Sequence, residues 1–197
     1  MIKQKRFSII ILCILILSSS LQLIGCKTIA TRADYPFYAD EQSLFEHADV
    51  IINGVVVKVN KPEKIDLNVH SAGEVAKEED KTLVTVSEIK VTDVIKGNVK
   101  VGDIVQVKQL GDKNGMAEES EMKYDGYFKK DSQYVLFLMD FNYLIPGIPY
   151  STLSPMQGQI SIVDGLTKVN AVNPLYKSGV PINEFVADLK AKVDKAK

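Results

Sequence analysis

Apolar and polar positions alternate along much of the chain, which is the pattern of half-buried β-strands. The clearest run is 48–59, which is rich in β-branched residues and carries Gly54 in its middle. Two further runs follow at 82–97, where the apolar positions change face in mid-run, and at 101–110. A mid-strand glycine and a change of face both indicate β-bulges, so we expect strongly coiled strands.

The second half of the chain predicts a buried strand, a hairpin and a helix. The run 132–141 is apolar without alternation, as expected of a strand covered on both sides. Two short runs flank Asp164 and Gly165, which suit a two-residue hairpin turn. Apolar residues then recur at helical spacing: Ile182, Phe185, Val186, Leu189 and Val193. We expect Asn183 to cap this helix and its end, from residue 190, to fray.

The segments outside these runs predict one short helical turn and three loops. Asp40 is placed as an N-cap, with Leu44 and Phe45 as the apolar contacts of the turn that follows. Three segments are predicted as loops: 61–81, 111–125 and 142–158.

Five or six coiled strands followed by a terminal helix predict a mainly β fold. We expect a small, closed or partly open Greek-key barrel of the OB type, with a short N-terminal helical turn and a C-terminal helix. A β-sandwich is the alternative.

The strand pattern over 48–138 resembles the netrin-like domains, an OB-fold family that includes the tissue inhibitors of metalloproteases. The resemblance rests on strand order, on the turn V-x-x-V-x-K-G that ends at Gly97, and on the G-D-x-V-x-V run from Gly102. It implies an OB fold and no catalytic residues. The inhibitors chelate zinc through a free N-terminal cysteine held by disulfides, which this chain does not reproduce, so we do not expect protease inhibition.

The N-terminal 25 residues have the three parts of a signal peptide. Three basic residues precede an apolar run at 7–17, which is too short for a bilayer span of about 20 residues, and a less apolar stretch follows. The sequence Leu23-Ile24-Gly25-Cys26 then resembles the lipobox of bacterial lipoproteins. The resemblance implies that diacylglycerol alkylates the Cys26 thiol and that a peptidase cleaves the bond before it.

This resemblance sets the expected domain organisation and location. We expect residues 1–25 to be removed, residues 26–40 to form a lipidated N-terminus and tether, and residues 41–197 to form a single domain. Two or three acyl chains would hold the protein on the extracytoplasmic side of the cell membrane. An uncleaved anchor helix is the alternative, and the shortage of cysteine suits a Gram-positive organism.

Charge and cysteine content exclude several kinds of activity. The whole chain has a formal net charge of −1, and removing three basic residues makes it more acidic, so we expect no nucleic-acid partner. Cys13 leaves with the signal peptide and Cys26 carries lipid. The expected mature domain therefore has no disulfide, no catalytic thiol and no cysteine metal site.

Candidate chemistry elsewhere is sparse. His47 and His70 have no second histidine or cysteine at ligand spacing, so we interpret them as solvated or capping residues rather than metal ligands. The acidic stretch 111–121 falls one step short of the calcium-loop template. No serine lies in a nucleophile motif. We therefore predict no catalytic residue, no metal and no cofactor.

The loop at 142–158 is the candidate for binding, because it combines prolines and glycines with aromatic and aliphatic residues and has few polar ones. We name Tyr143, Ile148 and Tyr150 as a candidate binding patch. The alternative is that this loop closes the end of the barrel and buries its rings.

The sequence favours a non-enzymatic interaction module for an envelope protein, peptide or glycan. An envelope hydrolase with an unfamiliar site is the main alternative, and a transporter's substrate-binding lipoprotein a weaker one.

Overall fold

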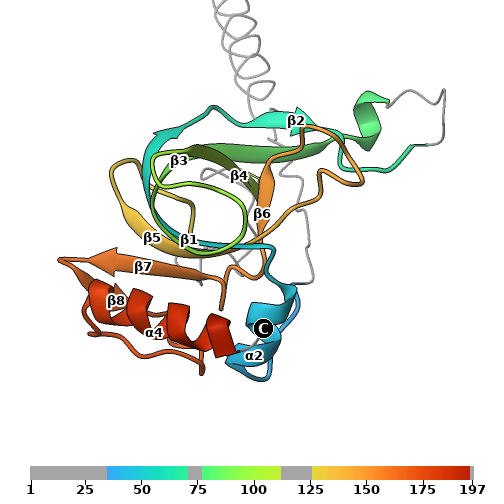
Figure 1. The fold of residues 1–197 in the computed structure, drawn as a ribbon. Coiled ribbons are helices and arrows are strands. Elements are labelled where there is room, and N and C mark those ends of the chain that lie inside the picture. The colour runs from blue at the N-terminus through green and yellow to red at the C-terminus, as the bar shows by residue number, and fades with distance from the viewer. Residues whose placement is uncertain (1–34, 71–76, 112–125, 196–197) are drawn as a thin grey trace, which may run out of the picture.

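Five strands of the chain close into a barrel (Figure 1). The structure is a computed structural model and describes residues 35–70, 77–111 and 126–195. In chain order the elements are α2 (Glu41–His47), β1 (Val50–Val59), β2 (Glu63–Ile65), the 3₁₀ turn η2 (Glu78–Asp80), β3 (Thr82–Lys96), β4 (Ile104–Leu110), β5 (Gln133–Met139), β6 (Tyr150–Thr152), β7 (Gln159–Val163), β8 (Leu166–Lys168) and α4 (Ile182–Lys195).

The pairing of these strands is that of an OB-like barrel. β1 pairs antiparallel with both β3 and β5, and β3 pairs antiparallel with β4. β6 closes the circle, because it lies parallel to β4 and antiparallel to β5. β2 extends β3, and the β7–β8 hairpin continues from β5. The mainly β, OB-like prediction is confirmed, and the sandwich alternative is not what the chain adopts.

The predicted bulges occur where β1 and β3 coil together. Asn53 pairs with Asp93 and Gly54 with Val91, so one residue of β3 is left over at this step. A Cβ at Gly54 would lie 2.7 Å from Cγ2 of Ile89. The glycine therefore lets the two strands approach closely enough to curl into a small barrel.

Two apolar clusters form the core, one on each side of the barrel wall. The inner one fills the barrel and consists of buried residues from the closing strands and one loop: Val50, Ile52, Val56, Ile89, Val91, Val105, Val107, Phe128, Tyr134, Leu136 and Leu138. The outer one lies between the sheet and the two helices, which Figure 1 shows below β1, β7 and β8. In it the ring of Phe137 on β5 stacks on Phe45 of α2 and on Tyr176. β5 is therefore buried on both faces, as its continuous apolar run predicts.

Helix α2 and the β7–β8 hairpin form as predicted, and helix α4 differs from the prediction at both ends. Asp40 caps α2 by accepting a hydrogen bond from the Ser43 amide at 2.7 Å, as predicted. Asp164 and Gly165 have φ of 51° and 77°, the left-handed backbone that a two-residue hairpin turn requires. α4 begins at Ile182, before Asn183, so the predicted cap was wrong. It also continues to Lys195, because Val193 in the stretch expected to fray is buried against the core.

Three expectations about irregular segments need correction. The stretch 61–81 contains β2, which is ordered because β3 offers its free edge. The stretch 142–158 contains β6, which pairs on both sides and closes the barrel. The end of the predicted tether packs onto the domain, because Tyr38 is buried and its backbone N–H and C=O both bond to the side chain of Gln157.

Several predictions fall outside the described residues. They concern the signal peptide, the lipobox Leu23-Ile24-Gly25 with Cys26, and the acidic stretch from 112 to 121. Among the described residues, no helix combines the length and the apolar character that crossing a membrane requires.

Candidate binding pocket

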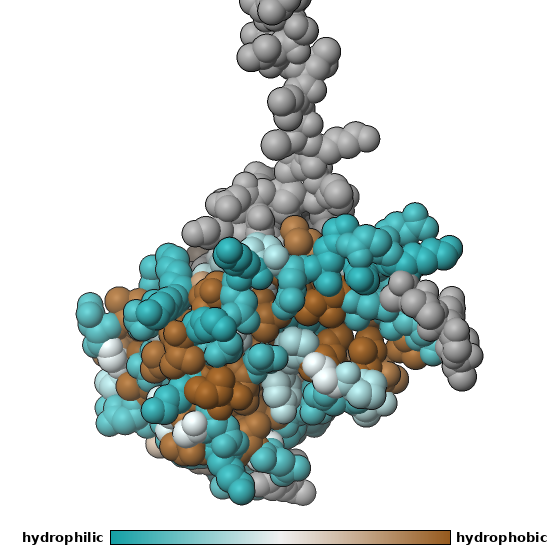
Figure 2. All heavy atoms as spheres, turned by 90° about the horizontal axis from the view of Figure 1, so that it is seen from above, coloured by the Kyte–Doolittle hydropathy of each residue, from teal (hydrophilic) through white to brown (hydrophobic). Residues whose placement is uncertain are grey.

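An apolar pocket of about 300 Å³ lies on the outer face of the barrel wall. Its floor is formed by β4 and β6, one wall by the loop 141–148, and the opposite wall by the segment that follows β2. The lining residues are Tyr35, Leu67, Val69, Lys108, Leu110, Phe141, Leu144, Ile145, Ile148, Ser151 and Thr152. Figure 1 shows the loop before β6 passing beside the end of β2. Figure 2 shows the molecule from above, with hydrophobic side chains between hydrophilic ones.

The floor of the pocket follows from the alternation along β4. Val105 and Val107 point into the barrel and join its core. Lys108 and Leu110 therefore lie on the outer face, where they line the pocket. The parallel pairing of β4 with β6 puts Ser151 directly beside Lys108. The polar part of the pocket is thus gathered at the floor.

The loop wall is held in shape by the side chain of Asn142. Its amide nitrogen donates to Oδ1 of Asp140 at 2.6 Å and to the carbonyl of Ile148 at 3.4 Å. Its amide oxygen accepts from the N–H of Gly147 at 2.9 Å. The loop is therefore preorganised by its own hydrogen bonds, and it holds Leu144 and Ile145 against the pocket without a ligand.

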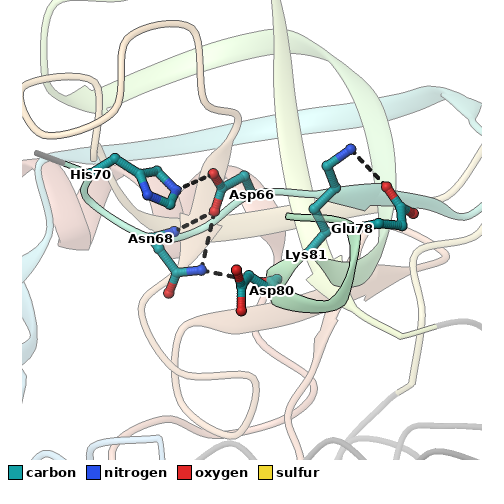
Figure 3. Close-up of polar contacts among 6 residues, drawn as sticks. All are labelled: Asp66, Asn68, His70, Glu78, Asp80 and Lys81. Atoms are coloured by element: carbon teal, nitrogen blue, oxygen red, sulfur yellow. Dashed lines mark hydrogen bonds and ion pairs between the residues drawn. The ribbon is translucent and has the colours of Figure 1, made fainter. Parts of the chain in front are cut away.

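The opposite wall is held by a network of polar side chains (Figure 3). Asp66 accepts hydrogen bonds from the backbone N–H of Asn68 at 3.0 Å and from its side-chain amide at 3.1 Å. Nε2 of His70 pairs with the other carboxylate oxygen of Asp66, and the amide of Asn68 also donates to the carbonyl of Asp80 at 3.1 Å. The N–H of Asn68 is the main cause that lowers the pKa of Asp66.

This network orients the apolar residues that alternate with its members. Asp66, Asn68 and His70 bond to one another, while Leu67 and Val69 line the pocket. His70 therefore has a positioning role in the wall through its pairing with Asp66.

Lys108 is the unusual residue of the pocket, because only 7% of its surface is exposed. Its Nζ donates to the carbonyl of Pro149 at 2.8 Å and lies 5.4 Å from the centroid of the Phe141 ring. Burial lowers the pKa of this amine to about 8. Within the described part of the chain it forms no ion pair.

The structure does not bring the predicted patch together. Tyr143 is 78% exposed and lies outside the pocket lining. Ile148 is buried and lines the pocket. Tyr150 is half-buried and packs against the barrel core, where burial and the charges of Asp140 and Asp49 raise its pKa. Of the three residues named as a candidate binding patch, only Ile148 lines the pocket.

The wall formed by Leu67 and Val69 and the buried amine of Lys108 were not predicted from the sequence. Leu67 and Val69 alternate with polar residues, a strand-like signal that the surrounding charge obscured. For Lys108 there is no local signal, because the loop that covers it is distant in sequence. Among the described residues, no group of three or more His, Cys, Asp or Glu side chains could hold a metal ion. His47 is exposed, and its ring Nδ1 lies 2.7 Å from the carbonyl oxygen of Ser43.

The fold and the pocket together define an OB-like barrel with a preformed apolar site on its outer wall. No family model, curated protein or solved structure matches this chain.

Proposed function

We propose that this chain is a lipid-anchored binding module of a bacterial cell envelope, and that the pocket between β4, β6 and the loop 141–148 is its ligand site. The proposal joins the lipobox-like sequence at 23–26 with the barrel that follows it. We also propose that the barrel is netrin-like. The strand order over 48–138 supports this relationship, as does the turn at Gly97, where φ is 104°.

The preformed apolar pocket is the observation that carries the binding function. A ligand site usually combines apolar walls with a few polar groups, at volumes of roughly 300 to 1,000 Å³. This pocket lies at the lower end of that range. Because Asn142 already holds the loop wall, a ligand would have little chain to order on binding, which favours affinity.

The lining supports binding rather than hydrolysis. An enzyme needs several polar side chains that converge on the reacting atoms. Lys108 is the one charged side chain among the lining residues of the pocket, and most of the others are aliphatic or aromatic. The apolar walls therefore suit recognition of a hydrocarbon surface.

The lipid on Cys26 would place this pocket at the outer face of the cytoplasmic membrane. Acyl chains contribute about 0.8 kcal/mol per buried CH₂, so two or three of them hold a protein durably. The module would then meet its ligand in the envelope, without dissociating from the membrane.

A neutral apolar probe tests the proposed function at the residue level. The full chain is labelled at its methyl groups for NMR and inserted into phosphatidylcholine nanodiscs. It is then titrated with 1-hexanol. We expect the methyl resonances of Ile145 and Ile148 to shift saturably. Leu144→Asp should abolish this response, because it puts a charge in the apolar wall.

Val163→Asp is the matched control for this substitution. Val163 on β7 is 48% exposed and Leu144 is 46% exposed, so both changes add one carboxylate at similar exposure. Val163 lies outside the pocket lining, so its variant should keep the response. Equal responses of the two variants, or none in the wild type, would contradict a ligand site in this pocket.

A further inference from the structure

Lys108 carries a cationic group on a side chain that is almost fully buried. A charge away from water is costly unless it is paired and hydrogen-bonded, and an apolar side chain of similar length would fill the same space. The two contacts given above, with Pro149 and Phe141, offset part of this cost. Neither carries a negative charge, so the ammonium lacks a counter-ion among the described residues.

The position of the amine makes the pocket amphipathic. A lysine ammonium has three N–H donors, and the carbonyl of Pro149 takes one of them. Ser151, which pairs with Lys108, lines the same floor and adds a hydroxyl group beside the ammonium. The walls opposite consist of Leu67, Leu144 and Ile145 with their apolar neighbours. A matching ligand therefore has an apolar body and an anionic group at one end.

We propose that the pocket binds an apolar monocarboxylate, with its carboxylate on the Lys108 ammonium and its hydrocarbon body between the loop 141–148 and the segment 67–69. This inference rests on the proposed function and names the ligand class of the same site. A single ammonium is neutralised by a single negative charge. A phosphate monoester would bring about −1.5 to −2 and leave charge buried without a partner.

The size of the pocket also favours a small monocarboxylate. About 300 Å³ accommodates a short chain or one ring, and not a whole two-chain lipid. The lowered pKa of Lys108 has the same physical origin, since the desolvation that disfavours its charge is what an entering carboxylate would relieve.

Three probes of equal chain length separate the charge from the apolar body. The full chain in phosphatidylcholine nanodiscs is titrated with hexanoate, 1-hexanol and hexyl phosphate, and the methyl shifts of Ile145 and Ile148 report binding at the pocket. We expect hexanoate to bind at least about tenfold more tightly than 1-hexanol, as a charge-assisted hydrogen bond at a desolvated site predicts. Hexyl phosphate should bind more weakly than hexanoate.

Variants assign this preference to one residue. Lys108→Met keeps the length of the side chain and removes its charge, so within this variant hexanoate should bind no more tightly than 1-hexanol. Lys168→Met, at an exposed position of β8, should keep the preference. Methyl resonances outside the pocket, such as those of Val163, should stay as in the wild type and show that the Lys108 variant is folded.

The outcomes distinguish this inference from the function on which it rests. Equal affinities of the wild type for hexanoate and 1-hexanol would overturn the carboxylate proposal and leave the apolar site standing. Tighter binding of hexyl phosphate would overturn it as well. If none of the three probes shifts the pocket methyls, the proposed function itself fails.

Discussion

The ammonium of Lys108 lies 5.4 Å from the centroid of the Phe141 ring, at the start of the loop that covers it. The same amine donates to the carbonyl of Pro149, the residue that directly follows this loop. One side chain of β4 therefore contacts Phe141, where the loop 141–148 begins, and Pro149, where the chain leaves it. The lysine that we assign to ligand binding also connects the pocket wall to the barrel.

Replacing Lys108 by methionine should change how stability depends on pH. The pKa of the amine is about 8 in the folded chain and 10.5 as its ordinary value, so the unfolded chain binds more protons between these values. This group therefore makes the wild type more stable as pH rises from about 8 to 10.5. At pH 7 the desolvated charge is fully destabilising, so Lys108→Met should be at least as stable as the wild type.

Urea unfolding of a chain that starts at Lys27, at pH 7 and at pH 10, measures this effect. The advantage of Lys108→Met over the wild type should shrink at the higher pH. Lys168→Met, which is exposed on β8, should show no such trend. A Lys108→Met variant that is less stable at pH 7, by an amount independent of pH, would mean that the amine is a structural cross-link.

Gly54→Ala should destabilise the barrel by about 1 to 3 kcal/mol, as overpacking of a close contact does. The new Cβ would lie 2.7 Å from Cγ2 of Ile89 and 2.9 Å from the carbonyl oxygen of Lys90. Gly102→Ala is the comparison, since no atom lies within 4 Å there and only its φ of 95° opposes a side chain. Urea unfolding measures the loss of stability in both variants. It shows whether the close contacts at Gly54 cost more than the backbone strain at Gly102.

Tyr143→Ala and Tyr150→Ala should separate in stability. Tyr143 is exposed, so its truncation should change the free energy of unfolding by no more than about 0.5 kcal/mol. Tyr150 packs against the barrel core while half-buried, so its loss should cost about 1 to 3 kcal/mol, below the value for a fully buried ring. Thermal melts of both variants check this; two equally large losses would place Tyr143 in the core.

The sequence predicts the strands of the barrel that are long enough to carry a pattern. The run around Gly54 and the continuous apolar run of β5 each have a local physical cause, so the barrel and its bulges could be predicted. β2 and β6 have three residues each, too few for a periodic pattern. Their pairing partners, and not their own residues, make them strands.

The pocket depends on contacts between distant segments, which is why it was predicted only in part. Lys108 sits at an alternating position on β4, where a lysine normally faces water. Its burial requires a loop 41 residues away, through the bond to Pro149. The aromatic and proline content of that loop made it a candidate for binding, but the turn held by Asn142 decides which of its residues face the pocket.

Cys26→Ala should abolish lipidation and leave unprocessed precursor, because no neighbouring residue can form the thioether. Metabolic labelling with an alkyne fatty acid, followed by gel analysis of the wild type and the variant, measures both effects. Undiminished label on Cys26→Ala would refute the lipid anchor. Cys13→Ala, in the segment expected to be removed, is the matched control and should be labelled and processed normally.

Intermolecular NOEs between hexanoate and the methyl-labelled full chain in nanodiscs test the central claim most directly. The account predicts NOEs from the hexanoate chain to the methyl groups of Leu144, Ile145 and Ile148, and none to Val163 on β7. NOEs confined to methyl groups outside the pocket lining, or equally strong at Val163, would contradict it.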